Sequence, residues 1–211
     1  QTVVFQENKA EGFKRTLGSY AFGDCTALTD VTLSGTNTSL GNDLFNGCTS
    51  LAALTLPEGI THMGHAMLRN TAVEQITVPA SVTSVSSYYS NGGNGPFAGC
   101  TTLKEVVFSE GITQILGSFC AMSDAESNLE NVGIPEGVTS IDYRAFHECL
   151  SLQTVYINSP TIAAKLTELV AADPENNHLQ RQLQRLYLTK ISTVHSFCSD
   201  ILREYAYKLD I

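Results

Sequence analysis

The chain has 211 residues and a formal net charge of −9, from 12 Lys and Arg against 21 Asp and Glu. Hydrophobic residues make up 43% of it and charged residues 16%, a composition typical of a globular protein and not of a disordered one. No apolar run approaches the roughly 18 residues that a membrane-spanning helix needs, and the acidic balance disfavours non-specific binding of nucleic acid. Because the chain begins at Gln1 without a charged and then apolar leader, we expect a fragment or a chain whose signal peptide has been removed.

Composition changes near Pro160. All 16 glycines lie in residues 1–159, and residues 160–211 contain none. The first stretch has 6 basic and 15 acidic residues and so holds the whole charge of −9, whereas the second has 6 of each and is neutral. We therefore expect two regions, one over 1–159 and a different one over 160–211.

A short motif recurs along residues 1–159. The segments Leu17–Cys25, Leu40–Cys48 and Ile141–Cys149 read LGSYAFGDC, LGNDLFNGC and IDYRAFHEC. Their central aromatic position recurs with spacings of 23, 23, 29, 23 and 26 residues, which is a period of 23 with two insertions. That position is occupied in turn by Phe22, Phe45, Leu68, Phe97, Cys120 and Phe146.

Each unit continues with a short strand in which apolar residues alternate with polar ones, so that one face is buried. One unit cannot bury its own apolar residues, but a stack of about six forms a continuous core. Turns such as Pro57–Gly59 and Pro135–Gly137 end the strands, and Val3–Phe5 looks like the strand half of a unit whose beginning is missing. The buried strand positions are Val31 and Leu33, Leu54 and Leu56, Ile76 and Val78, Val106 and Phe108, Val132 and Ile134, and Val155 and Ile157.

Residues of about 3–159 resemble the BspA-like leucine-rich repeats of bacterial surface proteins, whose units have the form Ile-Gly-x-x-Ala-Phe-x-Gly-Cys-x-x-Leu-x-x-Ile-x-Ile-Pro. The sequence departs from this form at Leu68 and Thr71 in one unit and at Cys120 and Ser123 in another. The resemblance implies an α+β fold: a leucine-rich-repeat β-solenoid of short strands in units of about 23 residues, followed here by a small helical segment. It implies no catalytic motif and no cofactor.

Four cysteines occupy one position of the repeat: Cys25, Cys48, Cys100 and Cys149. Neither a CxxC pair nor cysteine and histidine at zinc-site spacing occurs, so no metal site is expected. Equal spacing favours small thiols stacked inside the solenoid, although Cys25 and Cys48 of adjacent units remain candidates for a disulfide. Cys120, at an aromatic position, is expected to pack as a small hydrophobic residue.

The exposed positions of the strands predict an extended recognition surface. This row is mostly uncharged, so its residue types do not identify a ligand. The insertion 86–96 adds Tyr88 and Tyr89, which form either a partner contact or part of a flexible loop. The second insertion, 123–128, is treated as a solvated acidic loop, with calcium as a weakly supported alternative. The row itself consists of Thr32, Thr55, Thr77, Val107, Gly133 and Tyr156.

Three histidines of the repeat region, His62, His65 and His147, lie in different units. No serine, aspartate or second histidine stands at a spacing that suggests a catalytic triad. We therefore expect surface histidines.

The period of 23 ends at Ser159, where Ser159-Pro160 predicts a helix N-cap followed by proline at the first helical position. The helix should present Ile162, Leu166, Leu169 and Val170 on one face and stop before Asp173-Pro174. A second helix with Leu179, Leu183 and Leu186, an extended piece over 188–193 and a last helix from Val194 should follow.

Residues of about 161–211 resemble a second family, the large helicase/nuclease subunit of bacterial AddAB recombination enzymes. The similarity lies in Ala171–Leu183 and Ile191–Arg203. It implies proximity to single-stranded DNA for Thr193, His195, Ser196 and Phe197. ATP hydrolysis is not expected, because the segment contains no glycine and no phosphate-binding Gly-x-x-x-x-Gly-Lys-Ser/Thr loop occurs upstream. His195 is expected to begin a helix rather than to act as a catalyst.

Three functions follow from these patterns. The first is a non-enzymatic protein-interaction or adhesion module of a bacterial cell-surface protein, with a protein or surface ligand as partner. The second is a DNA-binding remnant without ATPase activity in residues 161–211, and the third is a structural spacer. The repeat covers three quarters of the chain and favours an extracellular or cell-surface location, whereas the second resemblance implies the cytoplasm.

Overall fold

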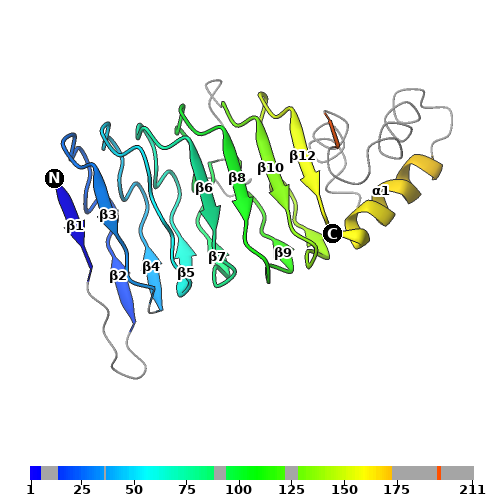
Figure 1. Cartoon of the computed structure of the whole chain (residues 1–211), viewed down its shortest axis with the longest axis horizontal. Coiled ribbons are helices and arrows are strands. Elements are labelled where there is room, and N and C mark those ends of the chain that lie inside the picture. The colour runs from blue at the N-terminus through cyan, green and yellow to red at the C-terminus, as the bar shows by residue number, and fades with distance from the viewer. Residues whose placement is uncertain (6–13, 36, 88–93, 122–127, 173–193, 196–211) are drawn as a thin grey trace.

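The structure is a computed structural model that describes residues 1–5, 14–35, 37–87, 94–121, 128–172 and 194–195. Short strands succeed one another in chain order along the long axis of the molecule and form a β-solenoid, which a helix follows at one end (Figure 1). Parallel neighbours arise because each coil returns the chain to the same side one period later. The fold expected from the repeat is therefore confirmed.

One side of the solenoid carries the longer strands, and we call it the first side. Parallel pairing joins β1 to β3, and it joins β6, β8, β10 and β12 in that order. A single bridge between Thr32 and Thr55 continues the ladder by one coil beyond β3. The strands are β1 Thr2–Val4, β3 Asp30–Thr32, β6 Gln75–Val78, β8 Glu105–Phe108, β10 Asn131–Ile134 and β12 Thr154–Ile157.

The other side, which we call the second side, carries shorter strands. A parallel sheet has the order β2, β4, β5, β7, and β9 pairs in parallel with β11. The register shifts between Thr38 and Ser39, where β4 meets β5. The strands are β2 Arg15–Leu17, β4 Thr38–Leu40, β5 Ile60–Met63, β7 Ser84–Val85, β9 Gln114–Ile115 and β11 Ser140–Ile141.

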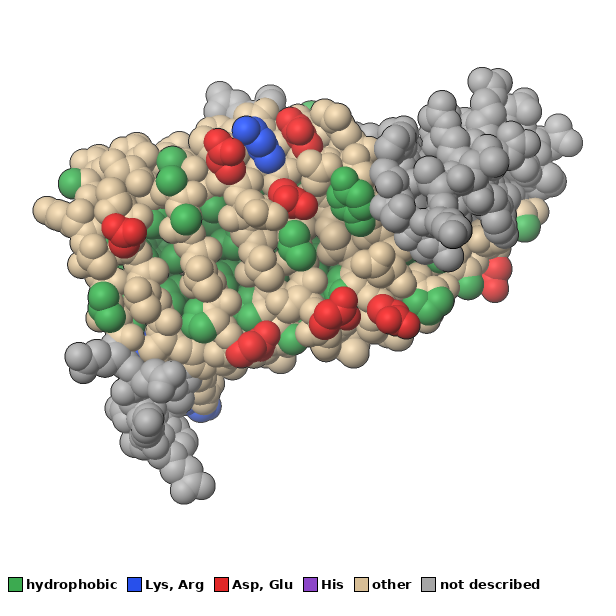
Figure 2. Space-filling view, in the orientation of Figure 1, with side chains coloured by type: hydrophobic (Ala, Val, Ile, Leu, Met, Phe, Trp, Pro, Cys, Tyr) green, Lys and Arg blue, Asp and Glu red, His purple; other side chains and the backbone are tan. Residues whose placement is uncertain are grey.

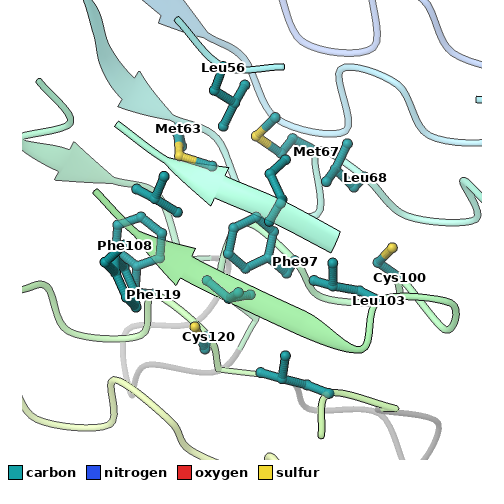
Figure 3. Close-up of a cluster of buried hydrophobic side chains, with 14 of the residues drawn as sticks. Leu56, Met63, Met67, Leu68, Phe97, Cys100, Leu103, Phe108, Phe119 and Cys120 are labelled. Carbon is teal, nitrogen blue, oxygen red and sulfur yellow. The ribbon is translucent and has the colours of Figure 1, made fainter. Parts of the chain in front are cut away.

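The core lies between the two sides. Phe108 on β8 packs edge-on against Phe119, with ring centroids 5.2 Å apart, and Phe119 in turn lies 5.9 Å from Phe97. Met63 on β5 enters the same core from the second side (Figure 3). Every apolar strand position that the sequence predicts as buried is less than one-tenth exposed. One continuous core therefore supports both sides.

The turn around each aromatic position requires backbone angles that glycine reaches most easily. Two residues before the aromatic position, φ is positive at Tyr20, Asp43, Ala66, Ser118 and Arg144. Two residues after it, φ is positive in five coils, and two of the five residues are glycine. The repeat thus fixes the turn even where the residue is not glycine. The five later positions are Asp24, Gly47, Asn70, Gly99 and Glu148.

Helix α1 spans Pro160–Ala172, as the sequence predicts. The Ser159 hydroxyl accepts a hydrogen bond from the backbone N–H of Ile162 at 3.2 Å, which confirms the predicted N-cap. Ile162 is fully buried and joins the core cluster of the solenoid. The side chains of Leu166, Leu169 and Val170 lie outside the described residues, and so does the helix expected around Leu179, Leu183 and Leu186.

The prediction of a last helix from Val194 is wrong at its first two residues. Val194–His195 forms strand β13, which pairs antiparallel with β12 through Thr154 and Val155. An unpaired β12 would present free backbone N–H and C=O groups, and pairing with β13 satisfies some of them. His195 consequently lies in an edge strand instead of starting a helix. Among the described residues, no helix has the length and apolar character that crossing a bilayer requires.

Candidate recognition surface

The exposed strand positions form one row across the first side. Parallel register places Thr77 beside Val107, Val107 beside Gly133, and Gly133 beside Tyr156. At the other end of the row, Thr32 is bridged to Thr55. Tyr156 is 37% exposed and is the largest side chain of the row. We call these six residues the central row.

The other candidate residues are not placed beside the central row. Tyr88 and Tyr89 lie outside the described residues, as do Thr193, Ser196 and Phe197. Of the candidates in the C-terminal segment, His195 alone has a described backbone, in β13 opposite Thr154. Ligand binding by any of these residues stays a prediction.

Carboxylates flank the central row on both borders of the first side. Figure 2 shows acidic side chains along one border and a second acidic group around a basic side chain near the other. On the second of these borders, Lys104 forms an ion pair with Glu74 at 3.4 Å, and both side chains are more than half exposed. Gln75 donates a hydrogen bond to Glu105 at 2.7 Å. The acidic residues of the first side are Asp30, Glu58, Glu74, Glu105, Glu110, Glu130 and Glu136.

These flanking carboxylates do not belong to the surface predicted from the sequence. The signal that reveals them is their repeat position: Glu58, Glu110 and Glu136 each precede the glycine of a turn that follows a strand. Glu74, Lys104 and Glu130 likewise share the position just before a strand. The charged columns, when aligned in the same register as the apolar ones, identify both borders.

The second side uses its polar groups within the solenoid. Thr61 donates a hydrogen bond to the carbonyl of Thr38, Thr83 donates to that of Thr61, and Thr139 donates to that of Thr113. Each of these bonds, 3.2–3.4 Å long, joins one coil to the next. The central row differs: within the described part of the chain, no side-chain hydrogen bond involves Thr32, Thr55, Thr77 or Tyr156, so these groups are available to a ligand.

His62 lies on the second side between two serines. Its Nδ1 is 2.9 Å from the hydroxyl of Ser84 and its Nε2 is 3.1 Å from that of Ser86. Desolvation by burial lowers the pKa of His62 from 6.5, so the neutral ring is favoured. No carboxylate completes a triad with this histidine among the contacts of the described residues. The ring therefore links β5 to the segment of β7 as a structural group.

The other two histidines contact acidic neighbours. His65 Nε2 lies 3.4 Å from Asp43, which also lies 3.9 Å from Arg69 Nε. His147 Nδ1 is 3.9 Å from a carboxylate oxygen of Glu148. All three histidines of the repeat region are only partly exposed, so the expected surface histidines are half-buried.

The repeated cysteines are free thiols, which excludes the Cys25–Cys48 disulfide in this structure. The Cys48 thiol donates to the carbonyl of Phe22 at 3.0 Å, and the Cys149 thiol donates to that of Cys120 at 2.9 Å. Burial raises the pKa of Cys48 to about 11 and that of Cys120 well above its usual value. Among the described residues no group of three or more His, Cys, Asp or Glu could hold a metal ion. The thiols thus bind neighbouring coils together.

The match to known repeats agrees with this geometry. Six copies of the family described as BspA type leucine rich repeat region match residues 15–149 and 92–167. The chain therefore belongs to the family of BspA-type leucine-rich repeat proteins. The repeats and the fold of this family are typically non-enzymatic and support protein interaction.

Solved leucine-rich repeat proteins have a similar architecture. One from T. pallidum is 20% identical, covers 80% of this chain and 82% of its own, and superposes with a TM-score of 0.48. A leucine rich cell surface protein from Faecalibacterium prausnitzii is 21% identical, covers 73% of this chain and 59% of its own, and has a TM-score of 0.33.

A second similarity concerns a short part of the chain. Fifty residues, 24% of the chain, are 54% identical to a protein of Natranaerobius thermophilus that is described as a subunit of an ATP-dependent helicase/nuclease. The identity to the corresponding protein of Moorella thermoacetica is also 54% over 50 residues. The chain spans 4% of the length of each of these relatives. The similarity expected for residues of about 161–211 is therefore confirmed as a similarity to a small fragment of a much larger protein.

Proposed function

We propose that this chain is a non-enzymatic recognition module of a bacterial cell-surface protein and that it binds a protein ligand through the first side of the solenoid. The observation that carries the proposal is the central row, where exposed side chains stand in register and form no hydrogen bonds within the described chain. The surface is continuous over the coils of β6, β8, β10 and β12, and repeat proteins bind partners through extended surfaces of this kind. Adhesion and surface location are supported by the family, whose members are often cell-surface proteins.

Tyr156 offers the sharpest test because aromatic residues dominate the binding energy of protein interfaces. The chain would be immobilised and challenged with purified host and bacterial surface proteins, and the affinity of each captured protein would be measured for two variants. Tyr156→Ala should weaken binding about tenfold or more. Tyr143→Ala is the matched control, since Tyr143 is 56% exposed but lies in a turn outside the central row.

Circular dichroism and thermal unfolding would establish that both variants fold. Equal affinities of the two variants for a captured partner would contradict recognition through the central row. Failure of all tested proteins to bind would leave the solenoid as a structural spacer, the alternative that the repeat alone also allows.

The fragment similar to helicase/nuclease proteins supports a second candidate function, binding of single-stranded DNA by residues 161–211. Binding of this kind weakens steeply with salt, because the protein displaces counterions from the phosphates. A gel-shift titration at low salt would compare the full chain with a chain ending at Ala172. Loss of binding on truncation supports the DNA function, and absence of binding by the full chain at low salt removes it.

We further propose that residues 160–211 act as a cap on the solenoid of residues 1–159. Ser159 caps helix α1, Ile162 is buried in the core cluster, and β13 pairs with the edge of β12. Repeat proteins need such covered ends for solubility. The chain ending at Ala172 tests this as well: size-exclusion chromatography should show self-association through the uncovered edge.

A further inference from the structure

We infer that the partner of the first side is a lysine- or arginine-rich polypeptide segment lying across the strands. This inference rests on the proposed function, since it names the class of ligand for the same surface. The central row gives the segment an uncharged floor, and the two carboxylate borders give it counter-charges on either side.

The charged side chains of the first side are almost all negative. Its seven carboxylates oppose one basic side chain, that of Lys104, which leaves a net side-chain charge of −6 from the described residues. Lys104 is itself paired with Glu74 and so neutralises little of the remaining charge. The potential above the central row is therefore negative along its length.

Three of the carboxylates have no partner of their own among the described residues. Glu58 accepts hydrogen bonds from the backbone N–H groups of Ala80 and Ser81 at 2.9 and 3.0 Å. By contrast, Glu110, Glu130 and Glu136 form no side-chain hydrogen bond or ion pair with any described residue. Glu110 and Glu130 lie on opposite borders, so unpaired negative charge stands on both sides of the central row.

The stacking of coils brings like charges close together. Neighbouring strands of a sheet lie about 4.8 Å apart, and Glu110 and Glu136 hold the same turn position in successive coils. Carboxylates at such a spacing repel each other, and exposure to water screens this repulsion only in part. A cationic ligand removes the repulsion, so the surface gains more from a basic partner than isolated carboxylates would.

The second side shows that this charge is a property of one surface. Its row of outward strand residues contains no carboxylate, lysine or arginine: Thr16, Ser39, His62 and Ser84 stand in register, and Gln114 stands beside Ser140. The two sides share the same coils and the same core, yet fewer carboxylates border the second side: Asp142 accepts a hydrogen bond from Gln114 at 2.6 Å, and Asp43 lies 3.4 Å from His65 and 3.9 Å from Arg69. An even acidic coat, present only for solubility, would cover both sides.

The uncharged centre favours a polypeptide over a point cation. Gly133 has no side chain, Val107 lies beside it and Thr77 lies beside Val107, so an extended backbone can approach the sheet closely over this part of the central row. Tyr156 at one end offers a ring face to a lysine or arginine side chain. Nucleic acids and anionic membranes are excluded as partners of this side, because their negative charge would be repelled.

The experiment reverses the sign of charge at one exposed position. A fluorescently labelled oligolysine peptide is titrated with the full chain at low ionic strength, and anisotropy reports binding. Thr77→Lys should weaken binding by about threefold to fivefold, and Thr77→Glu should strengthen it by a similar factor. Thr16→Lys and Thr16→Glu are the matched controls, because Thr16 is an exposed strand threonine of the second side; they should change affinity by less than about twofold.

A second variant removes charge without adding bulk. Replacing Glu110, Glu130 and Glu136 together by glutamine should weaken oligolysine binding by about tenfold. Because these side chains are free of described contacts, the thermal transition should not fall. Retention of wild-type affinity by this variant would overturn the inference even if the sign-reversal variants could not be purified.

The outcomes separate this inference from the proposed function. Equal shifts for the Thr77 and Thr16 pairs, or no binding of oligolysine at low salt, would overturn the basic partner. If Thr77→Lys and Thr77→Glu both weaken the binding of a protein whose affinity depends on Tyr156, the first side recognises a protein but not by charge. The proposed function itself fails when no tested protein binds, or when Tyr156→Ala and Tyr143→Ala bind the captured protein equally well.

Discussion

The second side of this solenoid and the central row of the first side are built from the same coils but use their polar side chains in opposite ways. On the second side, Thr61, Thr83 and Thr139 donate hydrogen bonds to the preceding coil, and His62 lies between two serines. On the first side, the central row forms no such bonds among the described residues. The central row is thus left open for recognition, while polar side chains of the second side and of the first-side borders, such as Gln75 bonded to Glu105, join the coils.

The largest expected effect tests whether the two sides share that core. Phe97 is fully buried and its ring lies 5.9 Å from that of Phe119, so Phe97→Ala should lower the free energy of unfolding by about 3–5 kcal/mol. Phe22→Ala is the matched control, since Phe22 holds the same repeat position but is only half-buried. Its cost should be smaller.

Chemical denaturation followed by far-ultraviolet circular dichroism would measure both variants of this pair. We expect one cooperative transition that shifts as a whole. If Phe97→Ala instead produced two transitions, the two sides would not share one cooperative core.

The next effect concerns the buried thiol of Cys48. The pKa of Cys48 is raised to about 11 from 9.0 because the thiol is buried. The unfolded chain therefore loses this proton at a lower pH than the folded chain, so stability is full below pH 9 and falls as the pH rises towards 11. The loss from this one group should be on the order of 2 kcal/mol.

Denaturant titrations at both ends of this pH range would compare the wild type with Cys48→Ala. The variant should be less stable at neutral pH, because it leaves a small cavity, but its stability should fall less steeply with alkali. An identical alkaline slope in both proteins would show that Cys48 does not titrate on unfolding.

A direct comparison removes one hydroxyl from the turn between β6 and β7 and one from the central row. The Ser81 hydroxyl accepts from the backbone N–H of Gly59 and donates to the carbonyl of Ile60, both at 2.8 Å, and so joins two coils. Ser81→Ala should cost about 1–2 kcal/mol. Thr77→Val on the first side should change stability by less than about 0.5 kcal/mol, because its hydroxyl forms no described bond.

Thermal and urea unfolding of these two variants would check the difference. Similar losses would mean that the side chains of the central row also stabilise the stack. The separation of cohesion from recognition would then be wrong.

The repeat made the fold predictable because the positions at which apolar residues recur are the positions that are buried. Pairs such as Leu54 and Leu56 or Val106 and Phe108 point inward on their coils, and stacking of the coils buries them in one core. The N-cap at Ser159 was predictable for a similar reason, since serine before proline is a local signal. Neither prediction depends on contacts between distant segments.

The strand at Val194–His195 could not be predicted in the same way. Apolar spacing after Val194 favours a helix, but the open edge of β12 offers backbone partners that local sequence does not report. The hydrogen bonds of Ser81 were hidden for the same reason, because they depend on which coil lies beside the turn. The central row could be predicted from the alternation of apolar and polar residues alone. Predicting its carboxylate borders requires an alignment of the charged positions of successive coils.

The smallest expected effect belongs to His62 on the second side. Burial lowers its pKa from 6.5, so the folded state favours the neutral ring. The unfolded chain therefore binds this proton at a higher pH than the folded chain does, and stability present above pH 6.5 is lost as the pH falls. His62→Gln keeps a group that can bond to both Ser84 and Ser86 but does not titrate, so it should reduce the acid-dependent loss. Urea titrations on either side of pH 6.5 would measure this loss, with His65→Gln as the control for removal of a neighbouring histidine. A steeper acid loss in His62→Gln than in the wild type would show that the protonated ring is stabilised by its two serines, and the second side would then respond to acid instead of serving only to hold the coils together.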